Sequence, residues 1–330
     1  MKFKRIRAID WSNPDIKLDD DTVLILGDHF GDEYSDEKIE IPKNITVFNH
    51  YSYYENTSPD VILLLGYFLK TVHNFKNYKM PLPSKSCCFN FMINKGRVNR
   101  KLLLAFINYF ELTSYMHTWT WTHKFYNDSS VLEYLHHSNP KHVNIRDLIQ
   151  KGFDTSRNHV DLKFLRIGIT ADQYARILPE IMNTAERYRL GLGDMFEQSV
   201  VSLITEPVGV AKAMMFTEKT AFAMVGLTFP LWVGGYKQAQ EFERFGFNVF
   251  HNVIDHSYQF EENFVDRCFV AIRDNLQILT NFEYAHKCWN ENLDALQCNQ
   301  QHLVSQNLVN HITAPISHFS EEVKGQLLAV

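Results

Sequence analysis

The chain has 330 residues, of which 45 % are hydrophobic and 22 % are charged, so it can bury a sizeable core and is too apolar to be disordered. The net charge is −5, and the five cysteines form neither a C-x-x-C pair nor a zinc spacing, which predicts reduced thiols in the cytoplasm and no disulfide framework. The charged N-terminus does not resemble a signal peptide. The longest uncharged stretch, residues 220–236, contains Pro230 and three glycines, so we expect buried core there and no membrane span.

The first third of the chain contains short apolar runs that are bounded by turn residues. Thr22–Leu26, Ile45–Phe48 and Val61–Leu65 are rich in β-branched and aliphatic residues, which is typical of strands that are buried on both faces of a parallel sheet. A fourth strand is expected at Cys87–Ile93. The helix predicted after it carries apolar residues at helical spacing from Leu102 to Phe110.

A strand near Tyr115–Trp121 completes the first α/β unit. From Asn127 to about Phe164 the chain is rich in His, Asn and Ser and shows no long periodic element, which predicts loops and short helices. We therefore expect a domain boundary near residue 160, which divides the chain into a first α/β domain of residues 1–160 and a second α/β domain of residues 161–330.

The second half of the chain alternates strands with helices. In order, we expect a strand at Ser199–Thr205, a helix at Glu218–Val225, a strand at Phe229–Val233, a helix at Tyr236–Phe245, a strand at Phe247–Phe250 and a closing helix at Asn263–Phe282. This alternation is typical of a doubly wound parallel sheet. The predicted fold class is therefore α/β, with two Rossmann-like domains that face a cleft in which ligands bind.

The start of the second predicted helix carries the most informative residues. Glu206 follows a predicted strand, where a carboxylate projects into the crevice of an α/β sheet. Thr217 is a suitable N-cap, which puts Glu218 and Lys219 in the first turn of the helix, where the free N–H groups attract phosphate. Lys219 is expected to face the cleft and to bind a diphosphate. Glu218 could accept hydrogen bonds from both hydroxyls of a ribose, so the pair suits a nucleoside diphosphate.

A family resemblance supports this interpretation. Thr217-Glu218-Lys219-Thr220, followed by a strand that ends in Gly234-Gly235, resembles the donor-binding signature of fucosyltransferase-like glycosyltransferases of the two-domain GT-B type. The continuation to Tyr258, with the upstream pattern Arg97–Arg100, resembles phage and viral glycosyltransferases. The resemblance implies that Glu218 binds the ribose, that Lys219 binds the diphosphate and that Arg100 reaches across the cleft to phosphate. The full donor-binding set that we expect is Arg97, Glu206, Thr217, Glu218, Lys219, Thr220, Gly234, Gly235, Asp255 and Tyr258, the last two bordering the sugar.

The sequence departs from this family at three positions. His256 and Gln259 stand where the viral pattern tends to have acidic residues, and Asn99 stands where it tends to have histidine. The roles of those acidic residues in this chain are therefore in doubt.

Transfer of a sugar requires stabilisation of the leaving diphosphate and usually a base for the acceptor hydroxyl. Lys219, Arg100 and the helix start could stabilise the diphosphate without a metal, and no cofactor is expected beyond a UDP- or GDP-linked donor. The first candidate for the base is Asp28, in the turn after the first strand, with His29 and Glu33 behind it. The weaker candidates are His117, His123 and His256.

The acceptor is suggested by a basic segment in the first domain. Residues 85–166 contain twelve Lys and Arg against six Asp and Glu, and Trp119 and Trp121 lie among them. Basic residues interleaved with aromatic residues suit a polyanion whose bases can stack, and the leading expectation is a hydroxymethylated base in phage DNA. The cytoplasm would then be that of the host. A surface glycan is the alternative acceptor, and a nucleotide-sugar-binding module without transfer activity is the alternative function.

Overall fold

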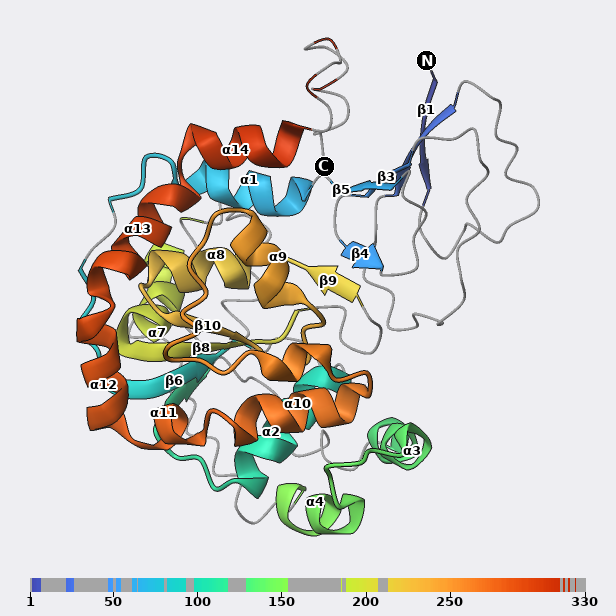
Figure 1. Cartoon of the computed structure of the whole chain (residues 1–330), viewed down its shortest axis with the longest axis vertical. Coiled ribbons are helices and arrows are strands. Elements are labelled where there is room, and N and C mark those ends of the chain that lie inside the picture. Colours follow the sequence, from blue (N-terminus) through green and yellow to red (C-terminus); the bar gives the residue numbers. More distant parts are fainter. Residues whose placement is uncertain are drawn as a thin grey trace.

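The computed structural model describes residues 2–6, 22–26, 47–49, 52–54, 61–63, 65–79, 82–92, 98–117, 129–153, 185, 188–206, 213–314, 317, 320 and 324. Within these ranges the protein is a mixed α/β structure with two four-stranded sheets and a further pair of short strands (Figure 1). None of the helices in these ranges is both long and apolar enough to cross a bilayer.

The first sheet is formed by residues from the start of the chain. It contains four parallel strands in the order β1-β2-β3-β5, formed by Lys2–Ile6, Thr22–Leu26, Val47–Asn49 and Val61–Leu63. The strand expected at Thr22–Leu26 is confirmed with the same bounds, and β3 and β5 overlap the two strands expected after it. A separate antiparallel pair joins β4 (Ser52–Tyr54) to β9 (Ala213–Met215). In the chain, β9 comes just before the helix that the sequence predicts at Glu218–Val225.

The second sheet combines strands from both halves of the chain. Its four parallel strands have the order β7-β6-β8-β10 and are formed by Tyr115–His117, Cys87–Phe91, Ser199–Ile204 and Phe229–Trp232. Each of them lies within a strand that the sequence predicts. The second sheet contains strands from both sides of the boundary expected at residue 160, because β6 precedes that residue and pairs with β8, which follows it.

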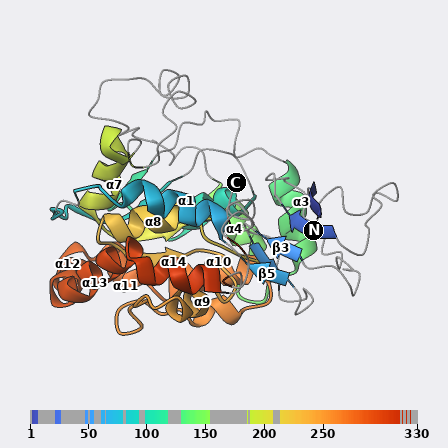
Figure 2. The same ribbon diagram turned by 90° about the horizontal axis from the view of Figure 1, so that it is seen from above.

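Helices cover both faces of the second sheet. The helices of the described residues are α1 Gly66–Phe75, α2 Val98–Tyr109, α3 Ser129–Ser138, α4 Ile145–Gly152, α7 Gly193–Gln198, α8 Glu218–Val225, α9 Gln238–Arg244, α10 Phe264–Arg273, α11 Leu276–Thr280, α12 Phe282–Glu291, α13 Leu293–Leu303 and α14 Gln306–Thr313, with a π-helical turn at Tyr188–Leu192 and a 3₁₀ turn, η5, at Ser257–Phe260. Successive residues of a strand point to opposite faces, and Leu231 packs with α2 and α10–α12 whereas Trp232 packs with α1, α7 and α8. Seen from above, the C-terminal helices run along one side of the molecule (Figure 2).

A buried group of polar side chains crosses the middle of the second sheet. Nδ2 of Asn90 on β6 donates hydrogen bonds to Oγ of Ser199 at 2.7 Å and to Oγ of Ser202 at 2.9 Å, both on β8. Oγ of Ser202 lies 2.7 Å from Oγ1 of Thr228, which donates to the carbonyl of Ala223 at 3.1 Å. A slip of one residue would leave these buried groups without partners, so they fix the register of β6 against β8.

Residues 247–250 do not form the expected strand. Asn299, from α13, takes the place of a neighbouring strand: its Oδ1 accepts a hydrogen bond from the Asn248 N–H at 2.8 Å and its Nδ2 donates to the Asn248 carbonyl at 2.7 Å. Oδ1 of Asn248 accepts from the Phe250 N–H at 2.7 Å, and Phe250 has a left-handed φ of 62°. The expectation was wrong because side-chain amides satisfy the backbone groups that a sheet would have used.

The closing helix expected at 263–282 is interrupted. α10 starts after its N-cap Asn263, but it ends at Arg273, and α11 begins only at Leu276. Nδ2 of Asn275 donates to the carbonyls of Ala271 at 2.9 Å and Asp255 at 3.0 Å, and its Oδ1 accepts from the Asp255 N–H at 2.9 Å. An asparagine whose side chain bonds to backbone in this way competes with helix continuation.

The substitution Asn90→Ala tests the role of the buried polar group. It removes the donor of two buried hydrogen bonds, so we expect it to lower the free energy of unfolding by about 1–3 kcal/mol. The measurement is urea unfolding followed by circular dichroism. Asn290→Ala, on the exposed side of α12, is the matched control and should change stability by less than about 0.5 kcal/mol. Equal effects of the two substitutions would contradict the proposed role of Asn90.

Candidate functional site

The second sheet has a topological switch point between β6 and β8. From β6 the chain continues through α2 to β7 on one side, whereas from β8 it continues through α8 to β10 on the other side. In open α/β sheets such a point leaves a crevice at the carboxyl ends of the strands, where ligands bind. Residues that follow β6 and β8 therefore form the candidate site.

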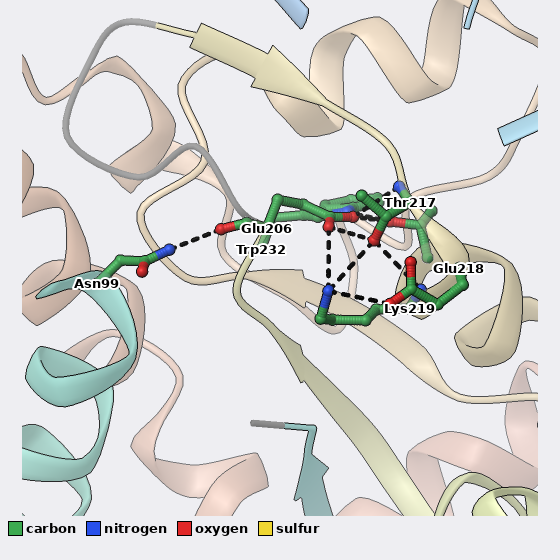
Figure 3. Close-up of polar contacts among 7 residues, drawn as sticks. Asn99, Glu206, Thr217, Glu218, Lys219 and Trp232 are labelled. Carbon is green, nitrogen blue, oxygen red and sulfur yellow. Dashed lines mark hydrogen bonds and ion pairs between the residues drawn. The ribbon is translucent and has the colours of Figure 1, made fainter. Parts of the chain in front are cut away.

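Seven residues at this point form a polar network that we call the carboxylate–lysine cluster. They come from the end of β8, the start of α8, the start of α2 and the end of β10, and are drawn as sticks in Figure 3. They are Asn99, Glu206, Thr217, Glu218, Lys219, Thr220 and Trp232.

Glu206 is the centre of the cluster. Its Oε1 accepts hydrogen bonds from the Thr217 N–H at 3.0 Å and from Oγ1 of Thr220 at 2.9 Å, and its Oε2 accepts from Oγ1 of Thr217. Nζ of Lys219 lies 3.7 Å from Oε2. One buried carboxylate therefore holds the N-cap, the first turn of α8 and the lysine together.

Thr217 caps α8 as the sequence predicts. Its side chain accepts a hydrogen bond from the Lys219 N–H, and α8 has the predicted bounds Glu218–Val225. Glu218 and Lys219 thus occupy the first turn, and Nζ of Lys219 lies 3.5 Å from Oε1 of Glu218 and 3.4 Å from Oγ1 of Thr217. The lysine bridges both carboxylates.

The orientation of Lys219 differs from the expectation. The residue is only 4 % exposed, and its ammonium group points to Glu206 and Glu218, so the expectation that it faces an open cleft is wrong. The physical reason is the buried charge of Glu206, because an ionised group in the interior requires a close partner of opposite charge. The Glu218 side chain keeps 19 % of its surface exposed and is the charged member of the cluster with the most access to solvent.

The two carboxylates have opposite pKa shifts. Burial raises the pKa of Glu206, against the opposing effects of Lys219 and of the hydrogen bonds from Thr217. Burial also acts to raise the pKa of Glu218, but the charges of Lys219 and Arg100 and a backbone hydrogen bond outweigh it and lower that pKa. Glu218 is therefore held in its ionised form, as an acceptor of hydrogen bonds, at the N-terminus of a helix.

Arg100 and Asn99 bring α2 to the cluster. The charge of Arg100 contributes to the lowered pKa of Glu218, and the expected contact of Arg100 with phosphate stays a prediction. Arg100 itself is buried. Nδ2 of Asn99 donates to the Glu206 carbonyl at 2.6 Å, and its Oδ1 accepts from the Arg100 N–H at 3.0 Å. Asn99 thus ties α2 to the end of β8, a role that sequence reasoning missed because no local pattern indicates the partner.

Trp232 is a second residue that sequence reasoning missed. Its Nε1 donates to Oγ1 of Thr220 at 3.0 Å, and its ring lies 6.1 Å from the ring of His256. Trp232 therefore connects the rest of the cluster to the loop after residue 250. Its place at the end of a predicted strand was the only signal in the sequence.

Gly234 and Gly235 are crowded by protein. Gly234 has a φ of 82°, and a Cβ there would lie 2.5 Å from the Phe264 ring. A Cβ on Gly235 would lie 2.3 Å from Oε1 of Gln238 and 2.9 Å from Cβ of the buried Trp232. These contacts are sufficient to require glycine at both positions, so the two glycines are not by themselves evidence for a nucleotide.

Asp255 and Tyr258 lie in different surroundings. Asp255 is exposed and lines an open pocket of about 580 Å³ beside α11, and hydrogen bonds from Ser257 lower its pKa against the effect of burial. Tyr258 is 1 % exposed, and burial strongly raises its pKa. A ligand in the pocket would therefore meet Asp255, whereas Tyr258 belongs to the core.

His256 is an unsuitable catalytic base in this structure. Its ring is buried, with Nε2 at 2.8 Å from the Val249 carbonyl and Nδ1 at 3.4 Å from the Tyr258 hydroxyl. Burial lowers its pKa to about 4. Both ring nitrogens are engaged inside the protein, which leaves neither of them directed at a substrate.

Several expected site residues lie outside the described part of the chain. They are Asp28, His29, Glu33, Arg97 and His123, together with Trp119 and Trp121 of the expected acceptor surface, and the side chain of His117 is likewise not described. Among the described residues no group of three or more His, Cys, Asp or Glu could hold a metal ion. No protein-family model matches the chain, and neither does any curated protein or solved structure.

The substitution Lys219→Met tests the balance of charges in the cluster. It leaves the buried carboxylate of Glu206 and the adjacent carboxylate of Glu218 without their counter-ion, so we expect a loss of about 3–5 kcal/mol in the free energy of unfolding at neutral pH. Lys287→Met is the control, because Lys287 is 72 % exposed and pairs with Glu291 on the surface of α12. A loss no larger than that of the control in urea unfolding would show that the cluster is not held by charge.

A second prediction concerns pH and His256. The folded state holds the pKa of His256 at about 4, below its ordinary value of 6.5, so the unfolded chain takes up the proton first as the pH falls. Stability should therefore decrease between pH 6.5 and pH 4, by roughly 3 kcal/mol from this residue. His256→Gln should flatten that part of the stability profile, measured by urea unfolding at several pH values. The exposed His137 supplies the control substitution, His137→Gln, and equal slopes in wild type and His256→Gln would contradict the assignment.

Proposed function

We propose that the protein is a glycosyltransferase that moves a sugar from a nucleoside-diphosphate sugar to an acceptor hydroxyl. The observation that carries the proposal is the position of Glu218, an ionised and partly exposed carboxylate in the first turn of α8, at the switch point of a parallel sheet. Such a carboxylate can accept hydrogen bonds from the two hydroxyls of a ribose, while the positive end of the helix dipole attracts the diphosphate.

The geometry of the cluster changes the role proposed for Lys219. Because its ammonium group is buried between Glu206 and Glu218, we propose that it positions Glu218 and keeps it ionised, and that Arg100 and the helix start meet the diphosphate. Lys219 is thus a positioning residue in this proposal. Asp28 remains the proposed base.

The remaining parts of the proposal rest on the sequence. They are a GT-B-like arrangement of two Rossmann-like domains around a cleft, a donor linked to UDP or GDP, no metal ion and a location in the cytoplasm. The basic segment at residues 85–166 favours a hydroxymethylated base in DNA as the acceptor, and a surface glycan is the alternative.

A module that binds a nucleotide sugar without transferring it is the second candidate. One observation favours it: two carboxylates already neutralise Lys219, so its charge contributes less to a leaving diphosphate than a free ammonium group would. Transfer of labelled sugar to hydroxymethylated DNA or to glycans would distinguish the enzyme from the module, since the module would bind the donor and release no product.

The substitution Glu218→Gln tests the proposed nucleotide site. We expect nucleoside diphosphates or their sugar conjugates to raise the melting temperature of the wild type, and Glu218→Gln to weaken this binding by about tenfold or more, because it replaces a charged hydrogen-bond acceptor. The measurement is a thermal-shift screen of uridine and guanosine diphosphates and their sugars, followed by calorimetry on any ligand that stabilises the protein.

The matched control is Glu283→Gln. Like Glu218, Glu283 lies in the first turn of a helix. Its helix is α12, which has an asparagine N-cap, and Glu283 is exposed to solvent. The Glu283→Gln protein should bind the same ligand as tightly as the wild type does. If no nucleotide stabilises the wild type, or if both substitutions weaken binding equally, the site is assigned wrongly.

A further inference from the structure

An open pocket lies where the loop 251–256 meets the junction of α10 with α11. Its remaining walls are η5 and Tyr284 of α12, and its volume of about 580 Å³ is within the range of small-molecule sites. The described residues of its walls include two aspartates, Asp255 and Asp274, but neither a lysine nor an arginine. The pocket therefore presents negative charge, which disfavours an anionic ligand and favours a cationic one.

Asp255 carries the part of this charge that the protein does not compensate. The carboxylate of Asp274 is bound by Arg273, with Nε at 2.6 Å from Oδ1 and Nη2 at 3.0 Å from Oδ2. Asp255 is exposed, and no ion pair joins it to another of the described residues. One carboxylate in the wall is thus left for a positive charge that a ligand would supply.

The two histidines of the walls do not supply that charge at neutral pH. His256 is buried, and burial lowers its pKa to about 4, so its ring is neutral. His251 has Nε2 at 3.6 Å from Oε2 of Glu243, so a proton on its ring would be offset by that carboxylate. The negative charge of Asp255 therefore remains the dominant charge on the walls.

Asp255 is also held rigidly and in its ionised form. Its N–H donates to Oδ1 of Asn275 at 2.9 Å, its carbonyl accepts from Nδ2 of Asn275 at 3.0 Å, and its Oδ1 accepts from the Ser257 N–H at 2.8 Å. Burial acts to raise the pKa of Asp255, but the opposing effects, led by hydrogen bonds from Ser257, outweigh it and lower that pKa. A carboxylate with this support loses little freedom when it binds a ligand.

Phe260 and Tyr284 supply aromatic rings at the same pocket. Phe260 is 53 % exposed, and Leu82 is the other large hydrophobic side chain that is exposed among the described residues. The face of an aromatic ring attracts an organic ammonium group, whose methyl or methylene groups also cover apolar surface. A metal ion needs several oxygen or nitrogen ligands, whereas an organic cation needs one carboxylate and an apolar contact, which are what these walls offer.

We propose that this pocket binds a small organic cation, a ligand with an ammonium group whose charge pairs with Asp255 and whose apolar body packs against Phe260. The inference goes beyond the proposed function and does not rest on it, because no nucleotide and no transfer step take part. The pocket is open and Asp255 is exposed, so the ligand stays partly hydrated and the binding is expected to be weak.

The test uses the full chain and simple cations at neutral pH and constant ionic strength. Saturation-transfer NMR with choline, tetramethylammonium and butylammonium should show binding of at least one of them to the wild type. Dimethylbutanol, the carbon isostere of choline, has the same shape without the charge. It should bind at least fivefold more weakly than choline, at the level of about one exposed ion pair.

Three substitutions change the walls in different directions. Asp255→Asn should weaken binding of the cation by about fivefold, because it removes the charge and keeps the shape. Phe260→Leu should weaken it by about threefold, because it keeps an apolar side chain and removes the aromatic ring. Arg273→Gln should instead tighten it by about twofold, because it leaves the charge of Asp274 uncompensated.

Two controls make the result specific. Asp294→Asn removes an exposed carboxylate from the first turn of α13, and it should bind the cation as the wild type does. Glu218→Gln should also leave this binding unchanged, so a failure of the proposed nucleotide site would not imitate a failure of the cation pocket. The inference is overturned if none of the cations binds, if dimethylbutanol binds as tightly as choline, or if Asp255→Asn, folded by circular dichroism, binds as the wild type does.

Discussion

The buried carboxylate of Glu206 is the interaction on which the candidate site depends. It lies two residues beyond β8 and accepts hydrogen bonds from the backbone and side chain of the N-cap of α8 and from Thr220. Its carbonyl is bound by Asn99, so the same residue also holds the start of α2. Because a charge in the interior must be compensated, Lys219 turns inward, and this leaves Glu218 as the charged side chain that reaches the surface.

The cluster thereby gives two chemically identical carboxylates different properties. Burial keeps the pKa of Glu206 above its ordinary value, whereas Lys219 and Arg100 keep that of Glu218 below it. Divergent pKa values within one small group of residues are a feature of functional sites, although structural ion pairs produce them too. In the proposed function, the inner carboxylate organises the helix start and the outer one accepts hydrogen bonds from the ligand.

The parts of this structure that follow from local chemistry were predictable, and those that follow from distant contacts were not. Three features depend on neighbouring residues alone, and the structure has them as the sequence predicts. They are the strand Thr22–Leu26, the helix Glu218–Val225 and its N-cap Thr217. The absence of a strand at 247–250 depends on Asn299, and the inward turn of Lys219 depends on Glu206. The neighbours Glu218 and Lys219 showed that a charged pair begins α8, but only the fold determines which of them is exposed.

The pairing of β6 with β8 has a consequence for the order in which the protein can fold. Residues 87–117 provide two strands of the second sheet, but their neighbours come from residues 199–232, so about half of the sheet cannot be completed until most of the chain has left the ribosome. Long-range parallel pairing of this kind is slow and leaves apolar strand edges uncovered in the meantime. The hydrogen bonds of Asn90 to β8 can then form only after β8 has been synthesised. A strand that pairs with β6 in the wrong register lacks these bonds and is less stable.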